Sequence, residues 1–169
     1  MKKTIKHKTA FVLVDMQTDV GSKKAKRAII PHQVAILKDC IRLSIPVVIV
    51  EFEGRGATHS ELTDAISGYQ HGHIIQKCGW SALRETTLAK ILTDFRVDTF
   101  LLGGIEACAC LYDTASDARP QGFRVVVCGD LTAGYERRYA GSNRRDLWQT
   151  LGVHYLENRG AAHRFLEAS

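Results

Sequence analysis

The chain has 169 residues, a formal net charge of +5 at pH 7, and 45% hydrophobic and 24% charged residues. This length suits a single domain, residues 1–169, with one sizeable core, and the composition is that of an ordinary globular protein. No apolar run approaches the roughly 20 residues that span a membrane, and the apolar run Ala10–Val14 is too short for a signal peptide. We therefore expect a cytoplasmic protein without a membrane partner.

Apolar runs alternate with amphipathic runs along the chain. In chain order the predicted elements are a strand at 9–16, a helix at 32–44, a strand at 45–52, a helix at 59–67, a strand at 73–77, a helix at 80–95, a strand at 97–104, a helix at 110–121, a strand at 123–130, a helix at 143–152, a strand at 153–156 and a helix at 161–167. Pro31 stands just before the first helix, and Ser60 and Ser81 are candidate N-caps of the second and third.

The predicted strands are continuously apolar, as parallel strands buried on both faces are. Their alternation with helices predicts an α/β fold, a three-layer α/β/α sandwich around a mostly parallel, roughly six-stranded sheet. In such folds, ligands bind outside the carboxyl ends of the strands. The residues that follow the strands are therefore the candidate site residues.

The chain contains five cysteines, Cys40, Cys78, Cys108, Cys110 and Cys128. An odd number in a chain of this size favours reduced thiols over a disulfide framework. No C-x-x-C motif is present, so neither a zinc knuckle nor a thioredoxin-like centre is expected. A cysteine is most often an ordinary buried residue, and we expect this of Cys108 and Cys128.

Basic residues cluster at Lys2–Lys8, Lys23–Arg27, Arg137–Arg138 and Arg144–Arg145. Such clusters can bind nucleic acid. Neither interleaved aromatic residues nor a recognisable binding module accompanies them, so we expect a solvated basic surface and no nucleic-acid partner. The alternative of a basic pocket that attracts an acidic small molecule stays open.

Three chemically complementary side chains follow predicted strands: Asp15, Lys77 and Cys110. A helix N-terminus and a nearby cation lower the pKa of a thiol, and a carboxylate can take up its proton. The Gly103-Gly104 pair permits a tight turn that could aim N–H groups at an oxyanion. Each residue alone has a plainer explanation, as a turn residue, a solvated charge or a core thiol, but together they predict a nucleophilic site.

Three motifs resemble those of the isochorismatase-like cysteine hydrolases, related to nicotinamidases, over nearly the whole chain. "VLVDMQTDV" is similar to the family's first strand and its D-M-Q-x-D-F, with Val20 in place of the aromatic residue. "IIQKCGWSALRETTL" resembles the family's lysine segment, and "GGIEACACLYDTASDARPQGFRVVVCGD" its nucleophile segment. Aligning Gly104, Thr114, Asp117 and Gly122 places the nucleophile on Cys110 rather than on Cys108.

The resemblance implies an Asp15–Lys77–Cys110 triad that cleaves a small amide, ureido or carbamoyl compound through a thioester. It also implies a cis peptide at Ile105-Glu106 and an oxyanion hole formed by the backbone N–H groups of Glu106 and Cys110. Thr114 and Asp117 are expected to be structural. Family members are commonly homo-oligomers, so we expect at least a dimer.

The nicotinamidase branch of this family holds a metal with Asp-x-His and a second His. Here Glu53 falls near the Asp position, Arg55 replaces the first His, and His71 is near the second. We therefore expect no metal and no cofactor. Arg55 is instead expected to bind a small anionic substrate, with Trp80 lining the pocket unless it belongs to the core.

Three other interpretations remain open. The fold could serve a catalytically silent binding or scaffold protein. The site could be that of a nicotinamidase-type amidase with a degenerate metal site. A papain-like or redox Cys/His enzyme would need a histidine near Cys110, for which only His59 and His71 are candidates.

Overall fold

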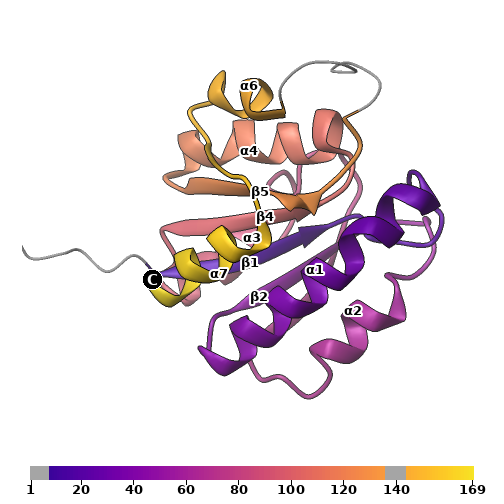
Figure 1. Cartoon of the computed structure of the whole chain (residues 1–169), viewed down its shortest axis with the longest axis horizontal. Coiled ribbons are helices and arrows are strands. Elements are labelled where there is room, and N and C mark those ends of the chain that lie inside the picture. The colour runs from indigo at the N-terminus through magenta and orange to yellow at the C-terminus, as the bar shows by residue number, and fades with distance from the viewer. Residues whose placement is uncertain (1–7, 136–143) are drawn as a thin grey trace, which may run out of the picture.

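The computed structural model describes residues 8–135 and 144–169. Of the basic clusters in the sequence, residues 2–7 and Arg137–Arg138 lie outside these ranges. Within the described residues, one parallel sheet has the strand order β3-β2-β1-β4-β5-β6. Figure 1 shows β2, β1, β4 and β5 in this order. The strands are β1 (Thr9–Val14), β2 (Val47–Phe52), β3 (Gly72–Lys77), β4 (Thr99–Gly104), β5 (Arg124–Thr132) and β6 (His154–Leu156).

Helices cover both faces of the sheet. They are α1 (Lys23–Arg42), α2 (Ser60–Ala65), α3 (Leu88–Asp94), α4 (Tyr112–Ala118), α6 (Arg144–Gln149) and α7 (Arg159–Glu167), with a π-helical turn η1 (Ala107–Leu111) and a 3₁₀ turn η2 (Arg119–Gln121). Helices α1, α2 and α7 pack on one face, and α3, α4 and α6 on the other. No helix in the described part of the chain is both long enough and apolar enough to cross a membrane. The predicted three-layer α/β/α architecture is confirmed.

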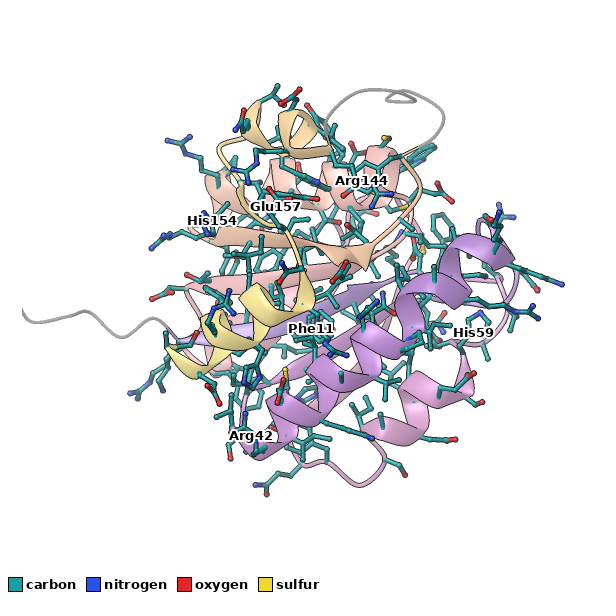
Figure 2. The ribbon with its side chains drawn as sticks, viewed as in Figure 1. Phe11, Arg42, His59, Arg144, His154 and Glu157 are labelled. Carbon is teal, nitrogen blue, oxygen red and sulfur yellow. The ribbon has the colours of Figure 1, made fainter. Side chains whose placement is uncertain are left out.

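Strand β1 divides the interior into two cores because its side chains alternate between the faces. Val12 and Val14 belong to the cluster under α3, α4 and α6, whereas Phe11 and Leu13 belong to the cluster under α1, α2 and α7. Figure 2 shows Phe11 inside, next to α1, and Arg42 at the outer surface. A strand that is buried on both faces is therefore the centre of the fold.

Helix α1 is longer than the sequence predicts. It begins at Lys23, where the Ser22 side chain accepts a hydrogen bond from the Ala25 N–H, and it includes Pro31. The expectation that Pro31 precedes the helix is wrong, because an N-terminal cap and a buried apolar face hold the helix together through the proline. Lys23 to Arg27 thus form its first turns.

Helix α3 is shorter than the predicted helix at 80–95. Residues before Leu88 form turns, in which Thr86 Oγ1 donates to the Ala82 carbonyl over 2.6 Å and accepts from the Leu88 N–H. Such local side-chain bonds compete with helix hydrogen bonding. Ser81, the predicted N-cap of this helix, therefore lies in a turn. Ser60, the predicted N-cap of α2, is instead its first residue, and His59 before it forms no side-chain cap hydrogen bond.

The chain reverses its direction of strand addition at β1. Strands β2 and β3 lie on one side of β1, and strands β4, β5 and β6 lie on the other. This reversal opens a crevice between the carboxyl ends of β1 and β4. At that point Gly104 has φ +121, and a Cβ there would lie 2.0 Å from the Val14 carbonyl oxygen.

Gly104→Ala is expected to lower the free energy of unfolding by roughly 3–5 kcal/mol, because the added methyl group meets backbone that cannot move aside. Urea unfolding followed by circular dichroism measures this loss. Gly68→Ala is the matched control, since Gly68 also has a positive φ (+74) but nothing lies within 4 Å of its Cβ position. Gly68→Ala should lower the free energy of unfolding by only about 1 kcal/mol. Equal losses for the two variants would contradict the role assigned to the contact between Gly104 and the Val14 backbone.

Candidate active site

Asp15 follows β1 directly and is fully buried. Its backbone has φ 57, a left-handed conformation that Asp tolerates better than most residues, and its N–H donates to the Val50 carbonyl over 2.9 Å. The chain therefore leaves β1 abruptly. The carboxylate stays at the carboxyl edge of the sheet, where the sequence predicts it.

Lys77 ends β3, and its ammonium group reaches Asp15 and Cys110. Its Nζ lies 3.0 Å from Asp15 Oδ2 and 3.4 Å from Cys110 Sγ, and neither side chain of the ion pair is exposed. The ammonium lies over the Phe52 ring, 4.3 Å from its centroid. The backbone carbonyls of Gly79 and Trp80 accept from it as well, over 3.0 and 3.2 Å. The ammonium thus forms hydrogen bonds with two carbonyls and the thiol and an ion pair with Asp15, and the thiol is the farthest of the four groups.

Cys110 lies in the π-helical turn η1, and 8% of its surface is exposed. The Leu111 N–H donates to the Glu106 carbonyl five residues back, over 3.2 Å. The Thr114 hydroxyl donates to the Cys110 carbonyl over 2.7 Å and accepts from the Ala82 N–H over 2.9 Å. These bonds fix the turn that carries the thiol, which agrees with the structural role predicted for Thr114. Single π turns often occur at functional sites.

Burial sets the protonation of this cluster. It raises the pKa of the Cys110 thiol to about 12, with a further increase from the Asp15 charge, and Lys77 opposes both only in part. Burial also raises the pKa of Asp15, against the lowering effect of Lys77. The expectation of a lowered thiol pKa is therefore wrong. The resting thiol keeps its proton, and Asp15 is a stronger base than an ordinary carboxylate.

A cavity of about 310 Å³ opens onto the thiol. Asp15, Cys110, Arg55 and Trp80, which the sequence selects, all line it, and Lys77 lies behind Asp15. Arg55 is exposed, with its guanidinium carbon 5.9 Å from the Phe52 ring centroid. Trp80 is 60% exposed and thus not a core residue.

Two carboxylates of the cavity wall have no role in the sequence predictions. The Asp19 side chain lies at the mouth, and the Glu106 side chain lies on the wall beside Gly21. Asp19 belongs to the first motif, but a loop residue with an acidic side chain is so common that the sequence alone does not place it in the cavity. Glu106 enters the predictions only through its backbone N–H.

The backbone before Cys110 turns sharply. The Ile105-Glu106 peptide bond is cis, and the Ile105 N–H donates to the Val14 carbonyl over 3.1 Å. The next N–H groups are directed away from the cavity, since Ala107 donates to the Ala133 carbonyl over 2.8 Å and Ala109 to the Glu106 carbonyl over 3.1 Å. The two amides assigned to the oxyanion hole, those of Glu106 and Cys110, flank this segment.

The model of the isochorismatase domain matches residues 9–151 of the chain. The chain belongs to the isochorismatase family. Nicotinamidase 3 of Arabidopsis thaliana is 25% identical in an alignment of length 147 that covers 75% of this chain and 73% of that protein.

Two solved structures of the isochorismatase fold superpose closely on the chain. N-carbamoylsarcosine amidase from Thermoplasma acidophilum does so with a TM-score of 0.74 and 24% identity, over 89% of this chain and 96% of that one. A cysteine hydrolase from Pseudomonas syringae pv. phaseolicola does so with a TM-score of 0.79 and 16% identity, over 95% and 92%. At these identities the likeness shows the shared fold.

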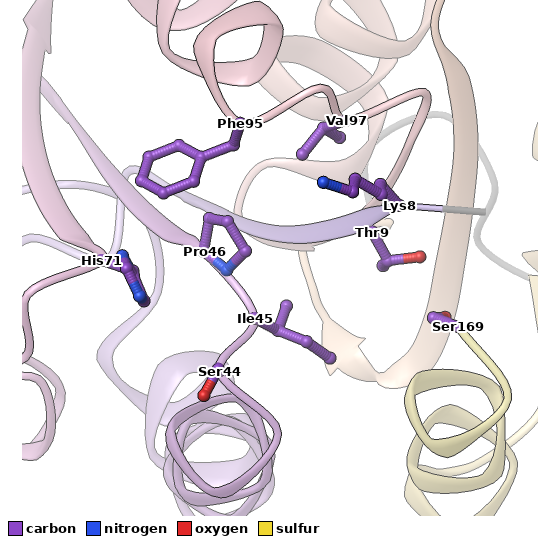
Figure 3. Close-up of a pocket in the computed structure, with 9 residues that line it drawn as sticks. All are labelled: Lys8, Thr9, Ser44, Ile45, Pro46, His71, Phe95, Val97 and Ser169. Atoms are coloured by element: carbon purple, nitrogen blue, oxygen red, sulfur yellow. The ribbon is translucent and has the colours of Figure 1, made fainter. Parts of the chain in front are cut away.

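The metal ligands of the nicotinamidase branch are not assembled in this family member. His71 precedes β3 and lies at the amino edge of the sheet, in a pocket with Pro46 and Phe95 (Figure 3). Glu53 accepts a hydrogen bond from the Cys78 thiol over 3.0 Å. Among residues 8–135 and 144–169, no three His, Cys, Asp or Glu side chains are placed to hold a metal ion. Glu53, which follows β2, and His71, which precedes β3, thus lie at opposite edges of the sheet.

The other cysteines have distinct surroundings. Cys128 is fully buried, as expected, whereas Cys108 is only half-buried, and its thiol donates to the Tyr135 carbonyl over 3.7 Å. The expectation of a buried Cys108 is wrong, because this residue of η1 packs against the core with only part of its surface. Cys78 is exposed, and its hydrogen bond with Glu53 raises its pKa.

Asp117 lies one turn beyond Thr114, away from the cavity. Its carboxylate pairs with the Arg84 guanidinium, with an Nε–Oδ2 distance of 2.7 Å. This pair ties α4 to the turns before α3. The structural role predicted for Asp117 fits this contact.

Asp15→Asn is expected to lower the pKa of the Cys110 thiol below about 12, because the neighbouring negative charge is removed while Lys77 remains. The rate of iodoacetamide alkylation of Cys110 against pH, followed by peptide mapping, should then show a midpoint at lower pH than in the wild type. Both measurements use a Cys78→Ser background, because Cys78 is exposed. A midpoint that rises in Asp15→Asn would contradict the electrostatic assignment.

Proposed function

We propose that this family member is a cysteine amidohydrolase that cleaves a C–N bond of a small amide, ureido or carbamoyl compound. The observation that carries the proposal is the Asp15–Lys77–Cys110 cluster at the inner end of the cavity, with Lys77 Nζ 3.0 Å from the carboxylate and 3.4 Å from the thiol. The names of the relatives, a nicotinamidase and an N-carbamoylsarcosine amidase, support the same bond type.

In the first step, Cys110 Sγ attacks the carbonyl carbon of the substrate while its proton passes to Asp15. The carbonyl π electrons move to oxygen, where the backbone N–H groups of Glu106 and Cys110 stabilise the negative charge. The C–N bond then breaks as Asp15 returns the proton to the nitrogen, which leaves as an amine or ammonia. A thioester remains on Cys110.

In the second step, water attacks the thioester carbon and gives a proton to Asp15. The C–S bond breaks, an acid is released, and the Cys110 sulfur regains the proton. Lys77 stays charged throughout and keeps the carboxylate and sulfur at a fixed separation. Asp15 thus alternates as base and acid, which requires the raised carboxyl pKa described above.

A silent binding protein explains the cluster less well. Burying an ion pair costs free energy, and Asp15 and Lys77 have no exposed surface on either side chain. A scaffold would be at least as stable with apolar residues at both positions. A role in chemistry on the adjacent thiol explains why a pair with this cost is present.

The substrate is expected to be small and to carry a carboxylate for Arg55, since this exposed guanidinium lines the cavity. Assembly into a homo-oligomer, the cytoplasmic location and the lack of a nucleic-acid partner stay predictions.

The proposed thioester can be trapped. A panel of small amides that includes nicotinamide and N-carbamoylsarcosine is incubated with the protein, quenched in acid and examined by intact-mass spectrometry. We expect one acyl group on Cys110 and release of ammonia or amine. Cys110→Ala should abolish both, and Asp15→Asn should reduce kcat/KM by about 10²–10⁴-fold, the range of general acid–base catalysis.

Cys128→Ala is the matched control, because it removes a buried thiol that does not line the cavity. It should keep the acyl-enzyme and the ammonia release. Hydrolysis that survives Cys110→Ala would refute the proposal, and a ligand that binds without ever acylating the thiol would favour the binding-protein interpretation.

A further inference from the structure

The mouth of the cavity carries two opposite charges side by side. The backbone beside Asp19 pairs with the segment that follows Arg55: the Thr18 N–H donates to the Ala57 carbonyl over 2.9 Å. Asp19 Oδ2 also lies against Gly56, where a Cβ would be 2.9 Å from that oxygen. Asp19 and Arg55 therefore project from neighbouring positions on two adjacent loops.

These two charges do not neutralise one another. Neither side chain forms an ion pair with another residue within the described ranges, although both are exposed and both line the cavity. Neighbouring opposite charges that stay apart are each available to a ligand. A ligand that carries a positive and a negative group would complement both.

Buried polar groups hold the two loops in place. The Gln17 side chain donates to the Phe52 and Gly56 carbonyls, over 2.9 and 2.6 Å, and accepts from the Phe52 N–H over 2.6 Å. The fully buried Lys26 donates from Nζ to the carbonyls of Gln17 and Thr18. The backbone on either side of the two charges is thus fixed before a ligand arrives, and such preorganisation favours binding.

A simple anion would fit this cavity poorly. Its carboxylate could bind Arg55, but it would also face the carboxylate of Asp19, which lines the same cavity. A simple cation would meet the Arg55 guanidinium. The ion pair of Asp15 and Lys77 adds no net charge deeper in the cavity. Only a ligand that carries both charges forms a favourable interaction with Arg55 and also with Asp19.

We propose that the substrate is zwitterionic, with a carboxylate that binds Arg55 and an ammonium group that binds Asp19, as in an amino acid whose side chain ends in a carboxamide or a ureide. This inference rests on the proposed amide hydrolysis for its reacting group. It extends that proposal by assigning Asp19 as a specificity residue opposite Arg55. A cavity of about 310 Å³ is at the small end for a ligand site, which fits a molecule of this size.

Four probes that share a primary carboxamide test the assignment: asparagine carries both charges, succinamic acid lacks the ammonium, β-alaninamide lacks the carboxylate, and propanamide lacks both. We expect kcat/KM for asparagine to exceed the values for succinamic acid and β-alaninamide by about tenfold each, the effect of one hydrogen-bonded charge. Asp19→Asn should remove the advantage over succinamic acid only. Arg55→Gln should remove the advantage over β-alaninamide only.

Asp64→Asn and Arg164→Gln are matched controls that make the same charge changes at exposed positions on α2 and α7. Both should keep the wild-type ranking. The inference is overturned if succinamic acid or β-alaninamide is preferred to asparagine in the wild type, or if Asp19→Asn lowers kcat/KM for all four probes equally.

Binding is measured separately, as protection of Cys110 against iodoacetamide by each probe. The expected ranking in protection without any turnover would support the zwitterion site while contradicting the proposed hydrolysis. Absence of protection by all four probes, or equal protection, would overturn the inference itself.

Discussion

Asp15 and Lys77 form an ion pair with an N–O distance of 3.0 Å, and both side chains are out of contact with solvent. One partner follows the central strand β1, the other ends the edge strand β3, and the thiol that both approach follows β4. Removing one member of such a pair leaves an unpaired buried charge at a cost of about 3–5 kcal/mol. The turn at Asp15, the extension of Lys77 across the Phe52 ring and the position of η1 are therefore mutually dependent.

The same burial explains the chemistry. A thiol with a pKa of about 12 is a poor nucleophile at rest, and a carboxyl group with a raised pKa is a better proton acceptor than one in water. The desolvation that disfavours the thiolate form of Cys110 also makes the Asp15 carboxylate a stronger base. In the proposed mechanism, Cys110 is therefore activated when substrate and oxyanion donors are in place, rather than ionised beforehand in the open cavity.

Much of this arrangement could be predicted from the sequence, because it depends on residue order. Apolar runs identify the strands, and strand ends share one edge in a parallel sheet, so Asp15, Lys77 and Cys110 could be brought together. What could not be predicted depends on tertiary context. The local hydrogen bonds of Thr86 hold the residues before Leu88 in turns and so delay the start of α3, and Pro31 is tolerated within α1 because of its packing and cap.

Electrostatic environment is also hidden in a sequence. Whether a thiol next to a lysine has a lowered or a raised pKa depends on how much water reaches it, and water access depends on every neighbouring element. The position of His71 could be predicted, because it stands just before the predicted strand at 73–77 and so at the opposite edge of the sheet from residues that follow a strand.

The reversal of strand addition at β1 has a consequence for biosynthesis. Asp15 and Lys77 emerge from the ribosome well before β4, while Cys110 comes only after the chain has returned to the other side of β1. Until β4 docks, the ammonium and carboxylate have no sulfur to act on, and the cavity lacks one wall. The proposed catalytic cluster is therefore completed only when Cys110 has been made, and a chain that ends before it carries the carboxylate and the ammonium without the thiol.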